Sequence, residues 1–213
     1  MAALPSALGQ VITVYDQMSY PGGLVADVPG IFPIQTNAPL GQTFVPNLAQ
    51  VGFVELYLST WRGQFPDLHV ETQRVSVALR EGSISGTILG ESDTVTINYN
   101  PPWSAFVERF GFPQPVTVTP GQTYVFEVCH EGGDDLIGLA FVCPHLVGQD
   151  YYPRGTYIQQ GQLWPSGLDI WFREGVLVVP EPRAWALMPL AAAALLVVKR
   201  RWRRPCPRPD RPA

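Results

Sequence analysis

Two cysteines and two histidines lie close together in one part of the sequence. Cys129 and Cys143 are 14 residues apart, near the ends of two expected strands, and an oxidising compartment would let them form a disulfide. Closing a loop of that length contributes about 3 kcal/mol in the chain-entropy account; the alternative is a pair of buried thiols. Together with His130 and His145, the two cysteines could instead bind zinc, which is a third interpretation. However, Cys129 and His130 are adjacent and so point to opposite faces of a strand.

An acidic loop offers ligands for a hard cation. Asp134 and Asp135 follow Glu131 and two glycines, and together with Asp16, Asp169 or backbone carbonyls they would supply the several oxygens that Ca²⁺ needs. No EF-hand spacing is present, and a solvated acidic turn is the alternative. Apart from this structural calcium, the sequence predicts no cofactor.

Tryptophan side chains are the third group of candidates. Trp61 and Trp164 lie in expected loops, where a flat apolar ring is free to stack on a sugar. Trp171 lies within an apolar strand and is expected in the core. Catalytic patterns are missing from the sequence: the acids are dispersed, and there is no nucleophile elbow, phosphate loop or zinc-protease motif. We therefore expect a protein that is not an enzyme.

The C-terminal segment, residues 180–213, carries three different features in a fixed order. Pro180-Glu181-Pro182 interrupts any helix or strand, residues 184–198 form an uncharged apolar run, and a basic cluster begins at Lys199. As a helix the run reaches about 22 Å, short of the roughly 30 Å hydrocarbon core, and snorkelling with an interfacial Trp185 would make up the difference. Basic residues resist translocation, so the body is expected outside the cytoplasm. A core helix with a solvated tail is the alternative.

These tail residues are similar to the PEP-CTERM sorting signal of bacterial exported proteins. The resemblance implies that an exosortase, a membrane-embedded cysteine transpeptidase, recognises Pro180, Glu181 and Pro182 and cuts near them while the inner membrane holds the tail. The implied membrane anchor comprises Trp185, Leu187, Leu190, Leu195, Leu196, Val197 and Val198, and the implied stop-transfer cluster comprises Lys199, Arg200, Arg201, Arg203 and Arg204. The chain departs from the pattern in a short run interrupted by Pro189 and in a further Pro- and Arg-rich extension.

Charge divides the chain into an acidic body and a basic tail. Residues 1–179 hold 16 acidic side chains and 6 arginines, a charge of −10, whereas residues 180–213 carry +6. Nucleic-acid binding requires basic side chains along the phosphates, so no nucleic acid is expected as a partner. At the other end, the small residues Ala7 and Gly9 suit signal-peptide cleavage before Gln10, although a charged and apolar leader is not seen in residues 1–9.

Short strands separated by turn residues dominate the body. Residues 19–40 are rich in proline and glycine and are expected to form a surface loop. Thr119-Pro120-Gly121-Gln122 has the pattern of a type II turn that joins two strands as a hairpin. Alternating apolar residues predict strands at 11–15, with Ile12 and Val14 in the core, and at 41–45, 51–59, 74–80, 88–89, 95–97, 105–110, 116–118, 124–128, 137–142 and 169–173.

The sequence thus predicts an all-β protein, an antiparallel β-sandwich of jelly-roll-like form, followed by a single C-terminal apolar helix and a basic tail. Expected segments are a signal-peptide remnant (1–9), the sandwich (10–178), the sorting signal with its membrane helix (179–204) and a disordered basic extension (205–213). Motifs such as Gln42-Thr43-Phe44 are similar to the β-sandwich ectodomains found ahead of such tails, which resemble galactose-binding-like and carbohydrate-binding modules.

Two functions follow as expectations. The first is an exported, non-enzymatic cell-surface or extracellular-matrix protein of a bacterium, held transiently in the inner membrane and sorted by an exosortase. The alternative is a carbohydrate-binding module that takes extracellular polysaccharide.

Overall fold

The computed structural model describes residues 10–20, 30–60, 72–98, 105–133, 137–142, 150–164 and 167–179. The chain divides into two units, one of residues Thr13–Leu177 and one that combines Met1–Ile12 with Val178–Ala213. Nearly all of the described residues belong to the first unit.

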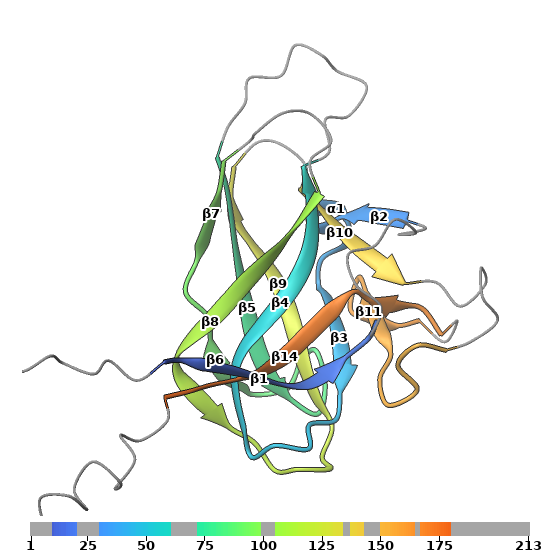
Figure 1. Ribbon diagram of the computed structural model, residues 1–213. Coiled ribbons are helices and arrows are strands. Elements are labelled where there is room, and N and C mark those ends of the chain that lie inside the picture. The colour runs from blue at the N-terminus through green and yellow to red at the C-terminus, as the bar shows by residue number, and fades with distance from the viewer. Residues whose placement is uncertain are drawn as a thin grey trace, which may run out of the picture. The chain divides into compact units, whose positions relative to one another are not determined.

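Two antiparallel sheets of seven strands each make up the first unit (Figure 1). Sheet A has the order β1 (Ile12–Met18), β14 (Phe172–Val178), β4 (Gln50–Thr60), β10 (Ile137–Val142) and β13 (Asp169–Ile170), with β8 (Ala105–Thr117) beside β4 and β2 (Gly30–Pro33) beside β10. Sheet B has the order β12 (Gln162–Leu163), β11 (Tyr157–Gln159), β3 (Leu40–Phe44), β9 (Tyr124–Gly132), β5 (Gln73–Glu81) and β6 (Ile88–Glu91), with β7 (Val95–Ile97) also beside β5. The predicted two-sheet, all-β sandwich is confirmed.

The hydrophobic core lies between the two sheets and is built from alternate residues of their strands. In β4 and β5 the period of two puts every second side chain on the core side, so that Val75, Val77 and Leu79 of β5 all lie in the core. The core includes Val54, Leu56, Leu58, Phe110, Phe141 and Phe172 from sheet A and Phe44, Val75, Val77, Leu79, Phe126 and Val128 from sheet B.

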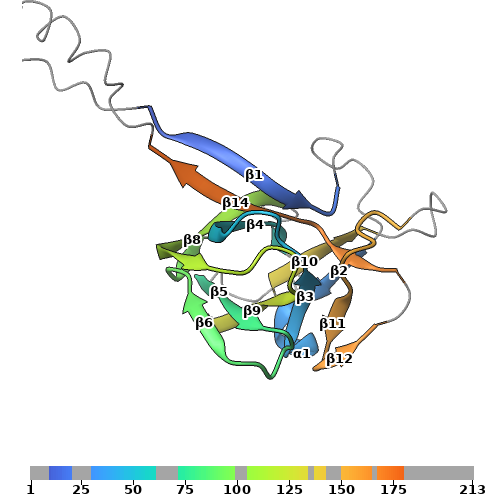
Figure 2. The same ribbon diagram turned by 90° about the horizontal axis from the view of Figure 1, so that it is seen from below.

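The chain passes repeatedly from one sheet to the other. The turn predicted at Thr119–Gln122 is present, since the Gln122 N–H donates to the Thr119 carbonyl at 3.1 Å and Gly121 has φ +82°. The strands on either side of it do not pair: β8 belongs to sheet A and β9 to sheet B (Figure 2). The predicted hairpin is therefore wrong, because the turn connects two layers of the sandwich.

Residues 30–40 are more regular than their composition predicts. Strand β2 pairs with β10, and a single helical turn, α1 (Ile34–Asn37), follows it. Proline is tolerated here because β2 is an edge strand and Pro33 is its last residue. Ile34 is fully buried, and the Phe32 ring meets Phe141 edge-on at 4.4 Å, so packing overrides the loop signal.

Strand β1 also differs from expectation. Ile12 and Val14 are 48% and 37% exposed, whereas Gln17 and Ser19 are buried. Ser19 exchanges hydrogen bonds with β14: its Oγ accepts from the Phe172 N–H at 3.0 Å, and its N–H donates to the Phe172 carbonyl at 3.1 Å. The inner side of β1 thus meets polar partners, and the prediction of an apolar core pair is wrong.

No helix among the described residues is long and apolar enough to cross a membrane. The apolar run at 184–198, the triplet at 180–182 and the basic residues after them lie outside the described residues.

Candidate functional site

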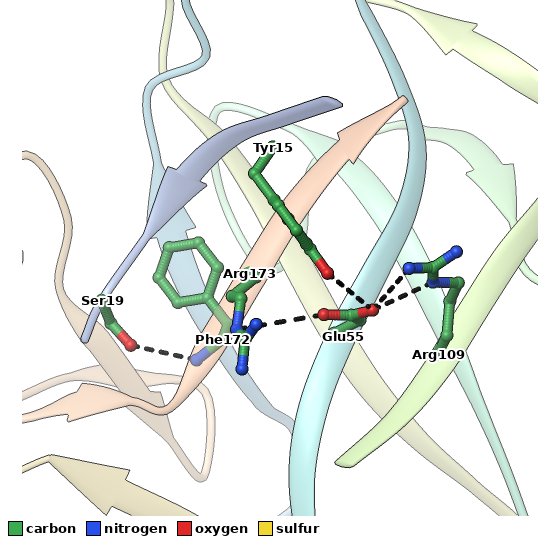
Figure 3. Close-up of polar contacts among 6 residues, drawn as sticks. All are labelled: Tyr15, Ser19, Glu55, Arg109, Phe172 and Arg173. Carbon is green, nitrogen blue, oxygen red and sulfur yellow. Dashed lines mark hydrogen bonds and ion pairs between the residues drawn. The ribbon is translucent and has the colours of Figure 1, made fainter. Parts of the chain in front are cut away.

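A row of charged side chains crosses the face of sheet A that is turned away from the core. Glu55 lies on this face because its neighbours Val54 and Leu56 in β4 are both in the core. The strand register pairs Glu55 with Arg109 of β8 on one side and with Arg173 of β14 on the other. The Arg109–Glu55–Arg173 row therefore spans three neighbouring strands (Figure 3).

Glu55 is the acceptor at the centre of this row. Arg109 donates from Nε at 3.0 Å and from Nη2 at 2.7 Å to Glu55 Oε1, and the Tyr15 hydroxyl of β1 donates to the same oxygen at 3.3 Å. Arg173 Nε lies 4.0 Å from Glu55 Oε2. Because Glu55 is only 6% exposed, these donors replace the water that the carboxylate loses on folding.

Aromatic rings flank the row on both sides. The guanidinium carbon of Arg109 lies 4.4 Å from the centre of the Phe53 ring, and that of Arg173 lies 4.7 Å from the centre of the Trp171 ring. Tyr57 in turn lies 5.8 Å from Trp171. Both arginines are held over aromatic faces, an attractive geometry for a cation.

This arrangement suits stacking and hydrogen bonding better than proton transfer. Among the described residues no second carboxylate joins the row, and hydrolysis of a glycosidic bond needs two. The side chains of Arg109 and Arg173 remain 35% and 26% exposed. Because Phe53 and Trp171 are fully buried, the arginines and not the rings are accessible to a ligand on this face.

Trp171 is fully buried, as expected from its apolar strand, but it is not part of the main core. It lies between β13 and β14, where its backbone N–H donates to the Ala140 carbonyl at 2.9 Å, while its indole N–H has no partner among the described residues. Its ring packs in a smaller cluster with Ala140, Val142 and partly buried neighbours that include Tyr57 and Tyr151. Trp171 thus anchors the aromatic side of the row rather than the space between the sheets.

Trp164, one of the two expected sugar-stacking residues, lies beside edge strand β12. It is 45% exposed, and its neighbour Leu163 is 63% exposed. The Trp164 N–H donates to the Tyr157 carbonyl at 2.9 Å, which fixes the backbone below the ring. Trp61 lies outside the described residues, so a joint role of the two rings stays a prediction.

Cys129 is a free thiol on β9, and burial, followed by the charge of Glu127, raises its pKa to about 11. A protonated thiol of this kind is a poor nucleophile and metal ligand. The neighbouring His130 ring nitrogen lies 2.9 Å from Gln73 Oε1. Cys143, the expected disulfide partner of Cys129, lies outside the described residues.

The expected calcium ligands Asp134 and Asp135 also lie outside the described residues. Within the part that is described, no three His, Cys, Asp or Glu side chains come close enough together to hold a metal ion. The other two carboxylates named for calcium, Asp16 and Asp169, are both engaged by hydrogen bonds from protein groups.

Asp169 belongs to a buried polar cluster that links the sheets. Gln42 of β3 donates to Asp169 Oδ1 at 2.7 Å and accepts from the Ile170 N–H at 3.0 Å, and the Tyr152 N–H donates to Asp169 Oδ2 at 3.1 Å. Burial, and then the charge of Asp150, raise the pKa of Asp169 to about 7, although the Gln42 hydrogen bond acts in the opposite direction.

A groove of about 460 Å³ lies between β6 and β8. It is lined by residues 89–91 and 112–117 and holds one titratable side chain, Glu91. None of the residues of the Arg109–Glu55–Arg173 row lines it, so the groove and the row are separate features of the surface.

Sequence reasoning did not find Glu55, Arg109 or Arg173. One signal was available: a lone Glu between Val54 and Leu56 in a strong strand has to face away from the core. The pairing with arginines from 54 and 118 residues further along depends on register across three strands, which one sequence does not specify.

Comparison of the chain with known proteins returns no matching family model and no matching curated protein.

Proposed function

We propose that this chain is an exported, non-enzymatic protein of a bacterial cell surface or extracellular matrix, sorted through a C-terminal PEP-CTERM signal. The observation that carries the proposal is the position of the tail features. The last strand of the sandwich ends at Val178, and Pro180-Glu181-Pro182, the apolar run and the basic cluster follow at once. A folded body next to a recognition triplet is the order that sorting requires.

The proposed assignment gives each part of the chain a role. Residues 184–198 form the membrane helix, the basic residues from Lys199 keep the end in the cytoplasm, and an exosortase acts on the triplet. The acidic body, of jelly-roll-like form, remains outside and is then released or attached at the surface.

The test is fractionation of the native host with and without its sorting protease. We expect a membrane-held, uncut form to accumulate when the protease is missing, and also when Glu181→Ala is expressed in the intact host. Asp210→Ala, which removes the other acidic residue of the tail, is the matched control and should be processed normally. An uncut protein that remains in the cytosol of the intact host would overturn the proposal.

A second candidate function is the binding of extracellular polysaccharide, and one observation favours it. Trp164 is 45% exposed, and its backbone N–H donates to the Tyr157 carbonyl at 2.9 Å, whereas the Phe53 and Trp171 rings beside the Arg109–Glu55–Arg173 row are fully buried. Aromatic faces beside hydrogen-bonding groups suit sugar rings.

A pull-down of the full chain with polysaccharide from the host matrix separates the two candidates. Saturable retention that is lost in Trp61→Ala or Trp164→Ala supports binding through these rings. Retention that is unchanged in both but lost in Arg173→Ala assigns it to the face of sheet A instead. No retention leaves sorting as the only proposed function.

A further inference from the structure

Strand β1 leaves one side of its backbone unpaired. It is the first strand in the order of sheet A, and β14 is its one partner strand among the described residues (Figure 2). Along its seven residues, the backbone N–H and C=O groups that point away from β14 therefore meet no strand in the described part of the chain. An open edge of this length is a template for pairing with a further strand.

The other edge strands of the two sheets are poorer templates. Among the described residues, β12 and β13 have two residues each, β7 has three, and β2 and β6 have four. Strand β8 is long, but Pro113 and Pro115 remove two of its backbone donors. Strand β1 contains neither proline nor lysine, the residues that most often block an open edge.

The exposed side chains of β1 are apolar or aromatic, and the strand is held in place by the fold. Ile12, Val14 and Tyr15 are 48%, 37% and 38% exposed. The Tyr15 hydroxyl donates to Glu55 Oε1 at 3.3 Å, and its ring meets the Phe53 ring edge-on at 5.8 Å. Residues of these types favour strand addition, and an edge that is already ordered loses little freedom when it binds.

The sequence of this edge is complementary to itself in an antiparallel arrangement. A twofold axis at Thr13 would place Thr13 opposite Thr13, Ile12 opposite Val14, and Val11 opposite Tyr15. Cross-strand pairs of β-branched and aromatic residues stabilise neighbouring strands, whereas like charges placed directly opposite each other destabilise them. The one charged residue of the strand, Asp16, would lie opposite Gln10 and not opposite a second carboxylate.

We propose that two copies of this chain associate by antiparallel pairing of their β1 strands about a twofold axis at Thr13. The two A sheets then form one continuous sheet, in which each β1 gains a second neighbour and Ile12 of one copy covers Val14 of the other. Because both copies use the same edge, the contact closes on itself and does not continue into a fibre. This association does not depend on the proposed sorting function.

The first test is the oligomeric state of the full chain, kept in solution by a mild detergent and measured by sedimentation velocity over a range of concentrations. We expect an equilibrium between monomer and dimer. Val14→Lys places a cation on the edge and should raise the dissociation constant at least about tenfold. Ile88→Lys, at a 44% exposed position of edge strand β6, is the matched control and should dimerise as the parent does.

Covalent trapping tests the register of the two strands. In Thr13→Cys the two introduced thiols would face each other across the axis, with Cβ atoms about 5 Å apart, so that a small adjustment gives disulfide geometry. Mild oxidation should then produce a covalent dimer on a non-reducing gel. The yield should clearly exceed that of the parent, whose own cysteines set the background, and that of Ile88→Cys on β6.

Three outcomes would overturn the inference. The first is a parent chain that stays monomeric at every concentration. The second is a dimer that Val14→Lys leaves intact, because the contact then lies elsewhere, as in the apolar run at 184–198. If a circular dichroism melt shows that Val14→Lys does not fold, the trapping experiment decides, and a yield for Thr13→Cys no higher than for Ile88→Cys contradicts the proposal.

Discussion

At the scale of single residues, each face of sheet A buries one glutamate, and the surroundings of the two carboxyl groups differ. Glu55 is buried on the outer face and is compensated by two arginines and a tyrosine. Glu174 is buried on the inner face without a donor among the described residues. Burial and the charge of Asp16 raise the pKa of Glu174 to about 9, so protonation removes the charge that Glu55 keeps and pairs with its arginines.

Removal of the Glu55 charge should be clearly destabilising. Glu55→Gln leaves Arg109 and Arg173 over their aromatic rings without the shared carboxylate, and we expect a loss of about 2 kcal/mol in the free energy of unfolding. Arg173→Gln should cost less, below about 1 kcal/mol, because its Nε is 4.0 Å from Glu55 and its side chain is partly exposed. Urea unfolding measures both; a larger loss for Arg173→Gln than for Glu55→Gln would contradict this account.

Asp169 should make stability depend on pH. Its pKa is about 7 in the folded chain against an ordinary value of 3.8, so between these values the folded state binds more protons than the unfolded state. Stability should therefore fall as the pH rises from about 4 to about 7 and level off above it, with about 1.4 kcal/mol for each unit of pKa displacement.

The comparison of Asp169→Asn with the parent isolates this contribution. Asparagine keeps an oxygen for Gln42 but does not titrate, so the decline in unfolding free energy over that pH range should be smaller in the variant. Identical slopes for the two proteins would show that Asp169 titrates normally.

At the scale of strands, alternation and turn residues located most of the sheet. The expected strands at 51–59, 74–80 and 137–142 correspond closely to β4, β5 and β10, because apolar period-two patterns reflect burial against a core. Two predictions, the hairpin at Thr119–Gln122 and the surface loop over residues 30–40, were wrong for one reason. In both segments the structure is decided by which distant strand the chain meets, sheet B after the turn and β10 beside β2. A local pattern predicts that a chain bends but not which sheet the next strand joins.

The candidate sites were less accessible from the sequence than the strands were. Arg109 and Arg173 meet Glu55 only through the register of β8, β4 and β14. Residues far apart in sequence are brought together by topology, which composition and spacing do not specify.

Two glycines on either side of Phe53 provide a matched test of strand packing. The register pairs Phe53 with Gly111 of β8 and with Gly175 of β14. A Cβ at Gly175 would lie 2.0 Å from the Val14 carbonyl oxygen, whereas a Cβ at Gly111 would meet nothing within 4 Å.

Gly175→Ala should therefore force β1 away from β14 and lower the melting temperature by several degrees, whereas Gly111→Ala should change it little. Hydrogen exchange should show faster exchange in β1 of Gly175→Ala, and protection equal to the parent would argue against the close approach of the two strands.

At the scale of the whole molecule, the body should fold without the tail. The main unit ends at Leu177, and Phe172 is the last core residue in the part of the chain that the structure describes. We expect a chain that ends at Val179 to melt at the temperature of the full protein. A chain that ends at Trp171, and so lacks β14, should not melt cooperatively, because β4 loses a neighbour and β1 loses the one partner strand that it has within the described residues. Circular dichroism melts of the two chains give the answer.

The position of β14 between β1 and β4 has a mechanical consequence. A pull on the end of this strand, directed along it, stresses hydrogen bonds to both neighbours together, and bonds sheared in parallel share the force. If the body is tethered by its C-terminus, as we propose, an external force would reach the sandwich through β14 and load its hydrogen bonds to β1 and β4 together.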